Sequence, residues 1–333
     1  MIERIKLKDR ITSGGNYHAS PKSEIEFISS GSTTLDLVLG GGWAENRIAN
    51  IVGDKSSGKT LLCIEAIANF AIKYPKGMIR YREAEAAFQL GYAEALGMPI
   101  NRVDFGESHL ETVEDLFEDL DYCAANAKEP ELYICDSLDA LSDRAELGRD
   151  MNAGTFGAEK AKKMSQLFRR LIRRLEEARI TVIIVSQVRS KIGIAFGRTT
   201  TRTGGRALDF YASQVLYLAQ AATITKTVSN IKRPVGVVVK AKMDKNKISL
   251  PFRETQFDIL FGYGLNDIGA CLDWLKQIGR LGDLGLSEKT MKGYEKELMS
   301  NPVQQELQRL HDTTSKSWYE IEMKFLPVVK KYA

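Results

Sequence analysis

The sequence predicts an α/β fold in which helices flank a mostly parallel β-sheet. From residue 28 to about residue 220, short β-branched runs alternate with stretches that carry apolar residues at helical spacing. Strands that alternate with helices of this length form parallel sheets covered on both faces. The glycine-rich segment GDKSSGKT, Gly53–Thr60, separates one such strand from the helix after it. We therefore expect this segment at the carboxyl end of a strand in the sheet.

The residue ranges of the expected elements follow from the same patterns. Apolar runs predict strands at Ile48–Val52, Met78–Tyr81, Leu132–Cys135, Thr181–Ser186 and Val215–Leu218. Helical spacing predicts helices at Leu61–Ile72, Leu110–Asn126 and Lys160–Ala178. Residues 221–262 break the alternation, and strand-like runs there predict an antiparallel edge at Val235–Lys242 and Gln256–Phe261.

The chain divides into three regions that differ in composition and in the pattern of apolar residues. Residues 1–27 are polar and irregular, which predicts a short N-terminal arm that serves in assembly. Residues 28–264 contain the alternating strands and helices and form the predicted core. Residues 265–333 are helical and charged, which predicts a small C-terminal domain.

Composition excludes several classes of protein. The 333 residues are 44% hydrophobic and 27% charged, which is typical of a globular chain with a sizeable core. Apolar runs such as Val182–Val185 are far shorter than the roughly 20 residues of a membrane span, and the N-terminus has no apolar signal segment. The four cysteines and three histidines are scattered, which disfavours a zinc site or a disulfide framework. We expect a cytoplasmic chain with reduced thiols and no membrane partner.

The segment Gly53–Thr60 fits the phosphate-loop pattern GxxxxGK[ST]. In such a loop, backbone N–H groups surround phosphate oxygens at a helix N-terminus, Lys59 reaches the β- and γ-phosphates, and Thr60 binds Mg²⁺. The run LYICD places Asp136 at the end of an apolar strand, where phosphate-loop NTPases hold the magnesium. We therefore expect ATP and Mg²⁺ as cofactors. The loop residues expected to bind the nucleotide are Gly53, Asp54, Lys55, Ser56, Ser57, Gly58, Lys59 and Thr60.

Hydrolysis also requires a group that orients the attacking water. Glu83 and Glu85 follow the strand Met78–Tyr81, and both are expected at the sheet edge that holds the phosphates. A carboxylate there can accept the proton of the water or orient it. Spacing alone leaves the choice between the two glutamates open.

A basic segment predicts a polyanion partner. The net charge is only +4, but no acidic residue occurs between Glu177 and Asp209. Glycine and threonine residues in this stretch let backbone N–H and hydroxyl groups approach phosphates, which suits sequence-independent DNA binding. Apolar side chains within it could insert between bases. The basic residues are Arg179, Arg189, Lys191, Arg198, Arg202 and Arg206, and the apolar ones are Ile192, Ile194 and Phe196.

These motifs together resemble those of bacterial RecA recombinases, from about residue 28 to residue 269. The most specific stretches are SQVRSKIGIAFG at Ser186–Gly197 and TGGRALDFYAS at Thr203–Ser213. The resemblance implies a RecA-type phosphate-loop NTPase core and a DNA-dependent ATPase that promotes homologous recombination. It also implies a head-to-tail helical filament of identical subunits, which assembles on single-stranded DNA and pairs it with homologous duplex.

The resemblance assigns roles to single residues around the nucleotide. Glu85 falls on the catalytic glutamate, and Gln187 matches the glutamine that senses the γ-phosphate. Tyr92 matches the tyrosine that stacks on adenine. Lys245 and Lys247, in the segment KNKISLPF, match lysines that contact the nucleotide of the neighbouring subunit.

The resemblance also places the second DNA-binding loop of the family in the basic segment. Phe210 matches an aromatic residue at the subunit interface. Gln89 replaces a common aspartate near the adenine, and the chain lacks an acidic tail, which suggests a divergent or phage-encoded relative that acts in the host cytoplasm. The residues expected to bind DNA are Lys162, Arg169, Arg189, Lys191, Ile192, Gly193, Ile194, Phe196, Gly197, Arg198, Arg202, Gly204, Gly205 and Arg206.

Two other classes share this core. A ring-shaped helicase usually carries an N-terminal helical domain, for which residues 1–27 leave no room. A recombination mediator would bind ATP and DNA without exchanging strands. The complete set of Lys59, Glu85, Asp136 and Gln187 favours an active recombinase over a mediator.

Overall fold

The computed structural model describes residues 25–85, 88–144, 157–190, 200–202 and 205–326. The expected N-terminal arm is therefore described only at residues 25–27. Several of the expected DNA-binding residues lie outside the described residues, namely Lys191, Ile192, Gly193, Ile194, Phe196, Gly197, Arg198 and Gly204.

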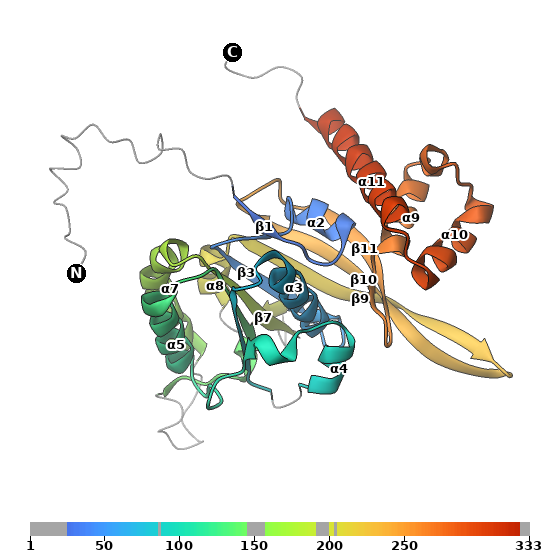
Figure 1. Ribbon diagram of the computed structural model, residues 1–333. Helices are drawn as coiled ribbons and strands as arrows, with labels where there is room; N and C mark the ends of the chain where they lie inside the picture. The colour runs from blue at the N-terminus through green and yellow to red at the C-terminus, as the bar shows by residue number, and fades with distance from the viewer. Residues whose placement is uncertain (1–24, 86–87, 145–156, 191–199, 203–204, 327–333) are drawn as a thin grey trace, which may run out of the picture.

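One large, mostly parallel sheet forms the centre of the molecule (Figure 1). Its parallel strands lie in the spatial order β9 (Gln214–Val228), β3 (Ile48–Gly53), β7 (Ile180–Ser190), β6 (Glu131–Asp136), β4 (Met78–Glu83) and β5 (Val103–Asp104). Beyond β9 the sheet continues antiparallel through β10 (Ile231–Asn246), β11 (Glu254–Leu260) and β12 (Gly264–Asn266). The short β8 (Thr200–Arg202) pairs antiparallel with β7, and β1 (Phe27–Ile28) pairs with β2 (Trp43–Ala44) in a separate two-stranded sheet. The predicted fold class and the predicted antiparallel edge are confirmed.

Helices cover both faces of this sheet (Figure 1). The first face carries α2 (Thr33–Leu39), α3 (Lys59–Lys73) and α4 (Leu90–Ala95), and the second carries α5 (Val113–Asn126), α7 (Gly157–Glu177) and α8 (Gly205–Tyr211). Ile51 packs into the core on the first face and its neighbour Val52 into the core on the second. Because both faces are buried, the strands β3, β6 and β7 are mostly apolar, as the sequence runs indicated, and Asn50 is a buried polar exception in β3. Among the described helices, none is long and apolar enough to cross a membrane.

The start of α5 differs from the predicted start at Leu110. The helix begins at Val113 because Thr112 is its N-cap. The Thr112 hydroxyl accepts a hydrogen bond from the Asp115 N–H at 3.1 Å, and the Asp115 carboxylate accepts one from the Thr112 N–H at 2.9 Å. This capping box ends the extended segment before the helix.

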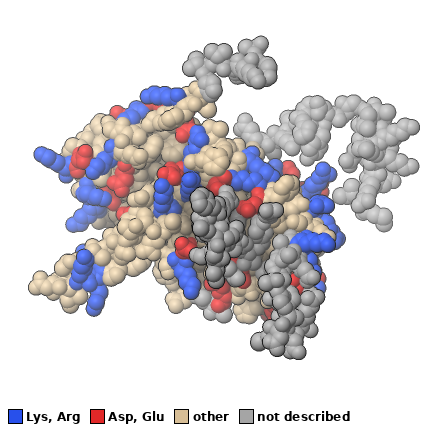
Figure 2. Space-filling view, turned by 180° about the vertical axis from the view of Figure 1, so that it is seen from behind, with Lys and Arg blue, Asp and Glu red and all other residues tan. Residues whose placement is uncertain are grey.

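A long hairpin projects from the body of the molecule and was only partly expected. The predicted strand ends at Leu218, but β9 continues to Val228 and returns as β10 (Figure 1). Beyond Leu218 almost every residue of β9 is exposed, so the apolar pattern that marks a buried strand is lost. The hairpin has no acidic residue between Ala219 and Gly236, and basic side chains stand out on its surface (Figure 2).

The C-terminal helices have a core of their own. It joins α9 (Asp267–Gln277), α10 (Glu288–Ser300), α11 (Gln304–Phe325) and the short helix η3 (Leu281–Leu284). The rings of Trp274 and Trp318 lie 4.8 Å apart between their centroids, and Trp318 belongs to the core of the first sheet face. The predicted boundary after residue 264 falls inside β12. The division of the chain into domains stays a prediction.

A buried glutamine holds the turn that leads from α2 towards β3. The Gln214 side chain is 1% exposed and lies at the start of β9. Its Oε1 accepts from the Ala44 N–H at 2.9 Å, and its Nε2 donates to the carbonyls of Leu39 at 3.0 Å and Gly42 at 2.9 Å. One side chain therefore bonds three backbone groups of this turn, of which the Leu39 carbonyl also accepts from Asn246 at 2.9 Å.

We expect Gln214→Leu to lower the free energy of unfolding by about 2–4 kcal/mol, because the replacement leaves buried backbone groups unpaired. The matched control is Gln220→Leu on the same strand, where the side chain is exposed and the change should stay within about 0.5 kcal/mol. Urea unfolding of both variants measures the difference. Equal losses in the two variants would contradict the anchoring role of Gln214.

Candidate nucleotide site and DNA interface

The phosphate loop connects the central strand β3 to α3. Gly58 is the N-cap of α3 and has a φ of 87°, a conformation that favours glycine. A Cβ atom at Gly58 would lie 2.4 Å from Cδ1 of Ile259, so a larger residue here would also force the end of that side chain in β11 to move. The first N–H groups of α3 are thereby left at the loop, as anion binding at a helix N-terminus requires.

Lys59 is oriented by the loop itself. Its Nζ donates to the carbonyl oxygens of Gly53 at 3.1 Å and Asp54 at 2.7 Å. Burial lowers the pKa of Lys59, while the charges of Asp136 and Glu85 act in the opposite direction. Neighbouring carboxylates therefore help to keep the ammonium charged at the point where phosphates are expected.

Thr60 and Asp136 meet at the edge of the sheet. The Thr60 hydroxyl donates to Oδ2 of Asp136 at 2.7 Å, and the Tyr81 hydroxyl donates to the same oxygen at 2.9 Å. Burial raises the pKa of Asp136, and these two hydrogen bonds oppose the rise. A hydroxyl and a carboxylate are oxygen ligands of the kind that Mg²⁺ prefers, so the donor set fits the predicted ion.

Glu85 contacts one residue directly after β6 and one residue in β7. Nε2 of Gln187 donates to Oε1 of Glu85 at 2.6 Å. The hydroxyl of Ser137 donates to the same carboxylate oxygen. These residues lie 102 and 52 positions from Glu85 along the chain, so the contacts depend on the order of the strands.

The two candidate glutamates, Glu83 and Glu85, make different contacts in the structure. Oε1 of Glu83 accepts from the backbone N–H of Glu85 at 3.0 Å, so Glu83 holds the backbone of this turn. The Glu85 side chain, in contrast, is the one that meets Gln187. The geometry favours Glu85 for the role that spacing alone left open.

Lys245 and Lys247 lie in a second cluster at the end of α8. Nζ of Lys245 donates to the carbonyl of Phe210 at 2.8 Å, and Nζ of Lys247 donates to the same carbonyl at 3.2 Å. The Lys247 ammonium also lies 5.8 Å from the centroid of the Phe210 ring, whose side chain is 68% exposed. The two lysines and the expected interface aromatic thus share one exposed surface.

Comparison with known proteins identifies the family. The model of the RecA N-terminal domain matches residues 2–266. Protein RecA of Arthrospira platensis is 38% identical over 265 residues, which cover 78% of this chain and 68% of that protein. Protein RecA of Synechococcus sp. (strain CC9605) is 37% identical over 263 residues, 78% of this chain and 66% of the relative, and that of Thermosynechococcus vestitus is 38% identical over 261 residues, 77% and 69%. The chain belongs to the RecA family.

Membership of the RecA family decides between the classes considered from the sequence. The similarity supports a RecA recombinase and does not favour the helicase or the mediator. RecA-family proteins are nucleotide-binding ATPases that act with DNA. The site residues themselves rest on the geometry above and stay predictions for this RecA-family chain.

The root of the expected second DNA loop adjoins Glu85. After Gln187, the last residues of β7, Val188–Ser190, pair with β8, with Arg189 opposite Thr201 and Arg202 opposite Val188. This hairpin stem begins at the residue whose side chain contacts the candidate catalytic carboxylate. Gly205 and Arg206 open α8, beyond the stem.

Helix α7 carries basic residues of two kinds. Lys163 and Arg174 pair with acidic residues of the same subunit, Lys163 with Glu114 at 2.6 Å and Arg174 with Asp121. Lys162 is exposed, and Nε of Arg169 donates to the Tyr211 hydroxyl at 3.4 Å. Arg169 thus reaches the residue next to Phe210. Both Lys162 and Arg169 stay predicted DNA contacts.

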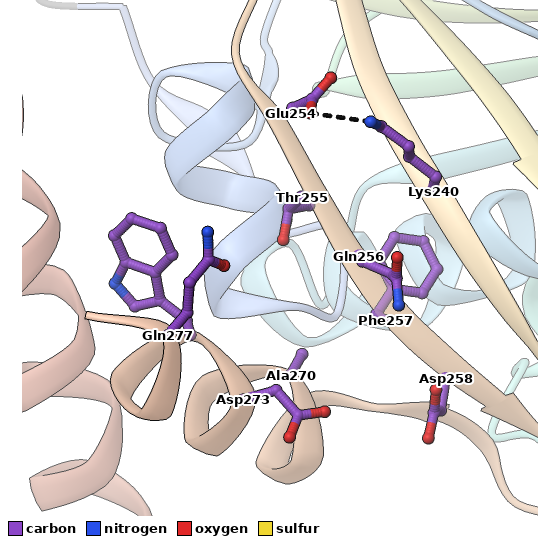
Figure 3. A pocket seen from close by; sticks show the side chains of 10 residues that line it. Lys240, Glu254, Thr255, Gln256, Phe257, Asp258, Ala270, Asp273 and Gln277 are labelled. Carbon is purple, nitrogen blue, oxygen red and sulfur yellow. Dashed lines mark ion pairs between the residues drawn. The ribbon is translucent and has the colours of Figure 1, made fainter. Parts of the chain in front are cut away.

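The predicted adenine contact and a hollow that the sequence did not predict lie in different parts of the structure. Tyr92 lies on α4 with 44% of its side chain exposed, on a surface where a base could stack. A hollow of about 420 Å³ lies between β11 and α9 and is lined by acidic residues, among them Asp258 and Asp273 (Figure 3). It contains none of the predicted nucleotide-binding residues.

Asp139 is a site residue that the sequence analysis missed. It lies in the short helix η2 (Leu138–Ala140), and its Oδ2 accepts from the backbone N–H of Gln187 at 2.6 Å. Ser137 and Tyr81 were missed as well. Ser137 directly follows Asp136, and Tyr81 lies four residues before Glu85. Their spacing does not reveal which side chains point into the site.

We expect Asp139→Leu to lower kcat for ATP about tenfold, because loss of a charged hydrogen bond to the Gln187 backbone releases Gln187 from Glu85. The KM for ATP should change little, since Asp139 lies outside the phosphate loop. Asp139→Asn keeps an oxygen acceptor and is the matched control, with kcat near the parental value. Steady-state ATPase assays with single-stranded DNA measure both parameters. Equal losses in the two variants, or a parallel rise in KM, would contradict the positioning role.

Proposed function

We propose that this chain forms a helical filament on single-stranded DNA, hydrolyses ATP between neighbouring subunits, and pairs the bound strand with homologous duplex. The observation that carries this proposal is the 2.6 Å contact between Gln187 and Glu85. Glu85 is the carboxylate expected to act on the attacking water, and Gln187 lies at the start of the expected DNA loop. The contact therefore connects the expected ATPase site to the expected DNA site. A DNA-dependent ATPase needs such a link between its two sites.

In the proposed site, bound Mg²⁺ would neutralise phosphate charge, and Thr60 and Asp136 would hold it. The α3 N-terminus and Lys59 would bind the phosphates of ATP. Glu85 would orient the attacking water and accept its proton. Tyr81 keeps Asp136 in place through the hydrogen bond of 2.9 Å.

The proposed filament completes each site with the neighbouring subunit. Lys245 and Lys247 lie at the end of α8 in their own subunit, bonded to carbonyls there, beside the exposed ring of Phe210. A half-buried and an exposed cation, Lys245 and Lys247, beside an exposed aromatic ring suit a contact with the nucleotide of the next subunit. Positive charge supplied from a neighbour would stabilise the transferring phosphoryl group, as an arginine finger does.

We place this activity in the cytoplasm. The four cysteines are free and buried, which suits a reducing compartment. DNA, the proposed substrate, is also found there, and for a phage-encoded chain the compartment would be the host cytoplasm.

We expect Glu85→Gln to bind ATP normally and to lose turnover by roughly 10²–10⁴-fold, the usual contribution of a general base. Glu83→Gln is the matched control, because its amide oxygen can still accept from the Glu85 N–H. Its turnover should stay within about threefold of the parental value. Nucleotide binding and single-turnover hydrolysis measure the two effects separately. Parental turnover in Glu85→Gln would overturn the assignment.

We expect Lys245→Ala and Lys247→Ala to act on the neighbouring subunit. Each isolated variant should bind nucleotide almost normally, while its filament loses ATPase activity. Mixing either variant with Glu85→Gln should restore part of the hydrolysis, because some interfaces then combine two intact halves. Electron microscopy with single-stranded DNA and an ATP analogue verifies that the mixtures assemble. Assembled filaments that recover no activity at any mixing ratio would contradict a shared site, and rings or monomers would contradict the filament.

A further inference from the structure

Three potential metal ligands meet where the C-terminal helices contact the core. Asp267 and Cys271 lie one turn apart on α9, and His311 faces them from α11. One ligand atom from each residue lies within 4.8 Å of the others. Nε2 of His311 is 3.0 Å from Oδ2 of Asp267, and Sγ of Cys271 is 3.7 Å from Oδ1 of Asp267.

These separations are close to those around a tetrahedral zinc ion. Zinc bonds of about 2.0–2.1 Å to nitrogen and oxygen and 2.3 Å to sulfur place neighbouring N and O ligands about 3.3 Å apart, and S and O ligands about 3.5 Å apart. The observed 3.0 and 3.7 Å end on different oxygens of the Asp267 carboxylate, so binding requires the carboxylate to turn until one oxygen faces both other ligands, or to bind through both oxygens. Sulfur and imidazole ligands favour zinc or cobalt over Mg²⁺ or Ca²⁺.

Further groups around the three residues resemble an outer ligand shell. Thr33, the first residue of α2, donates its N–H to Oδ1 of Asp267 at 2.6 Å and its hydroxyl to Oδ2 at 2.9 Å. Metal-bound carboxylates are held by hydrogen bonds of this kind. The Thr314 hydroxyl, one turn after His311 on α11, is completely buried, makes no hydrogen bond of standard geometry in the described part of the chain, and lies near the Cys271 thiol. A metal-bound water would be a partner for it.

We propose that Asp267, Cys271 and His311 bind one divalent zinc-type ion, with water as the fourth ligand. An ion can enter from the side of His311, whose side chain is 35% exposed, whereas Cys271 is fully buried. Binding replaces the thiol proton of Cys271, and it replaces a second proton where His311 is charged. Each ion bound therefore releases one to two protons.

The bound ion would fasten the C-terminal helices to the core. It joins α9 to α11 directly and reaches α2 through the two hydrogen bonds of Thr33. None of these residues belongs to the proposed nucleotide or DNA sites. The inference is therefore independent of the proposed function.

The chain contains a natural control for this site. Asp119 and Cys123 on α5 have the same spacing, and Sγ of Cys123 lies 3.9 Å from Oδ1 of Asp119. Arg82, instead of a histidine, binds that aspartate, with Nε 2.7 Å from Oδ2. A cation already neutralises the Asp119 site, so it should bind no metal.

The test titrates the chelator-treated full chain with Co²⁺, in excess Mg²⁺ that occupies the oxygen ligands of Thr60 and Asp136. We expect one Co²⁺ per chain, a thiolate-to-cobalt charge-transfer band, and displacement by Zn²⁺. Cys271→Ser should abolish the band and His311→Gln should weaken binding at least tenfold, whereas Cys123→Ser should change neither. No band in the parental chain, or the same band in Cys271→Ser, would mean that Asp267 and His311 form an ion pair only.

A second pair of variants covers the case in which Cys271→Ser does not fold. Thr33→Ala removes one of the two hydrogen bonds to Asp267 and should weaken Co²⁺ binding about 10–100-fold. Thr33→Ser keeps that hydroxyl and should retain parental affinity. Equal affinity of the Ala and Ser variants for Co²⁺ would overturn the proposed outer shell and, with it, the site.

Discussion

The parallel register of β4, β6, β7 and β3 is the constraint on which the site depends. Gly53 pairs with Gln187, and Glu83 pairs with Asp136. Because the carboxyl ends of parallel strands meet at one edge, these pairings bring the phosphate loop, the expected magnesium ligand and the expected DNA loop together. The hydrogen bond between Gln187 and Glu85 then closes the arrangement across the edge. A shift of one residue in either pair would separate groups that now lie within 3 Å.

Burial on both faces fixes this register. Along β7, Ile183 enters one core and Ile184 the other, and β3 alternates in the same way through Ile51 and Val52. A slip of one residue would exchange the two sets of side chains between cores of different shape. The apolar packing that stabilises the sheet therefore also sets the distances at its edge. The positions of the site residues are therefore set by side-chain packing in both cores, and the polar contacts alone would not determine them.

The same physics decides how much the sequence could predict. The central strands, the phosphate loop and Asp136 were predictable, because buried strands and glycine-rich turns leave strong local patterns. The projecting end of the β9–β10 hairpin was missed because exposed strands have no such pattern. Asp139 was missed because its role depends on strand order, and not on spacing. The group at Asp267 and His311 was missed for the same reason, since the two side chains lie 3.0 Å apart but 44 positions from each other along the chain.

The surroundings of Lys245 and Lys247 connect nucleotide binding to assembly in the proposed filament. Each ammonium donates to the carbonyl of Phe210 at the end of α8, where the helix dipole favours positive charge. A neighbour's triphosphate would offer these cations full negative charges in place of partial ones, so it would draw them away from the helix end. The Phe210 ring, 5.8 Å from the Lys247 ammonium, would then lose a cation that now lies against its face. Capture of a neighbour's nucleotide and a change at the exposed aromatic of the interface would be one event, which is how bound ATP could set the geometry of the filament.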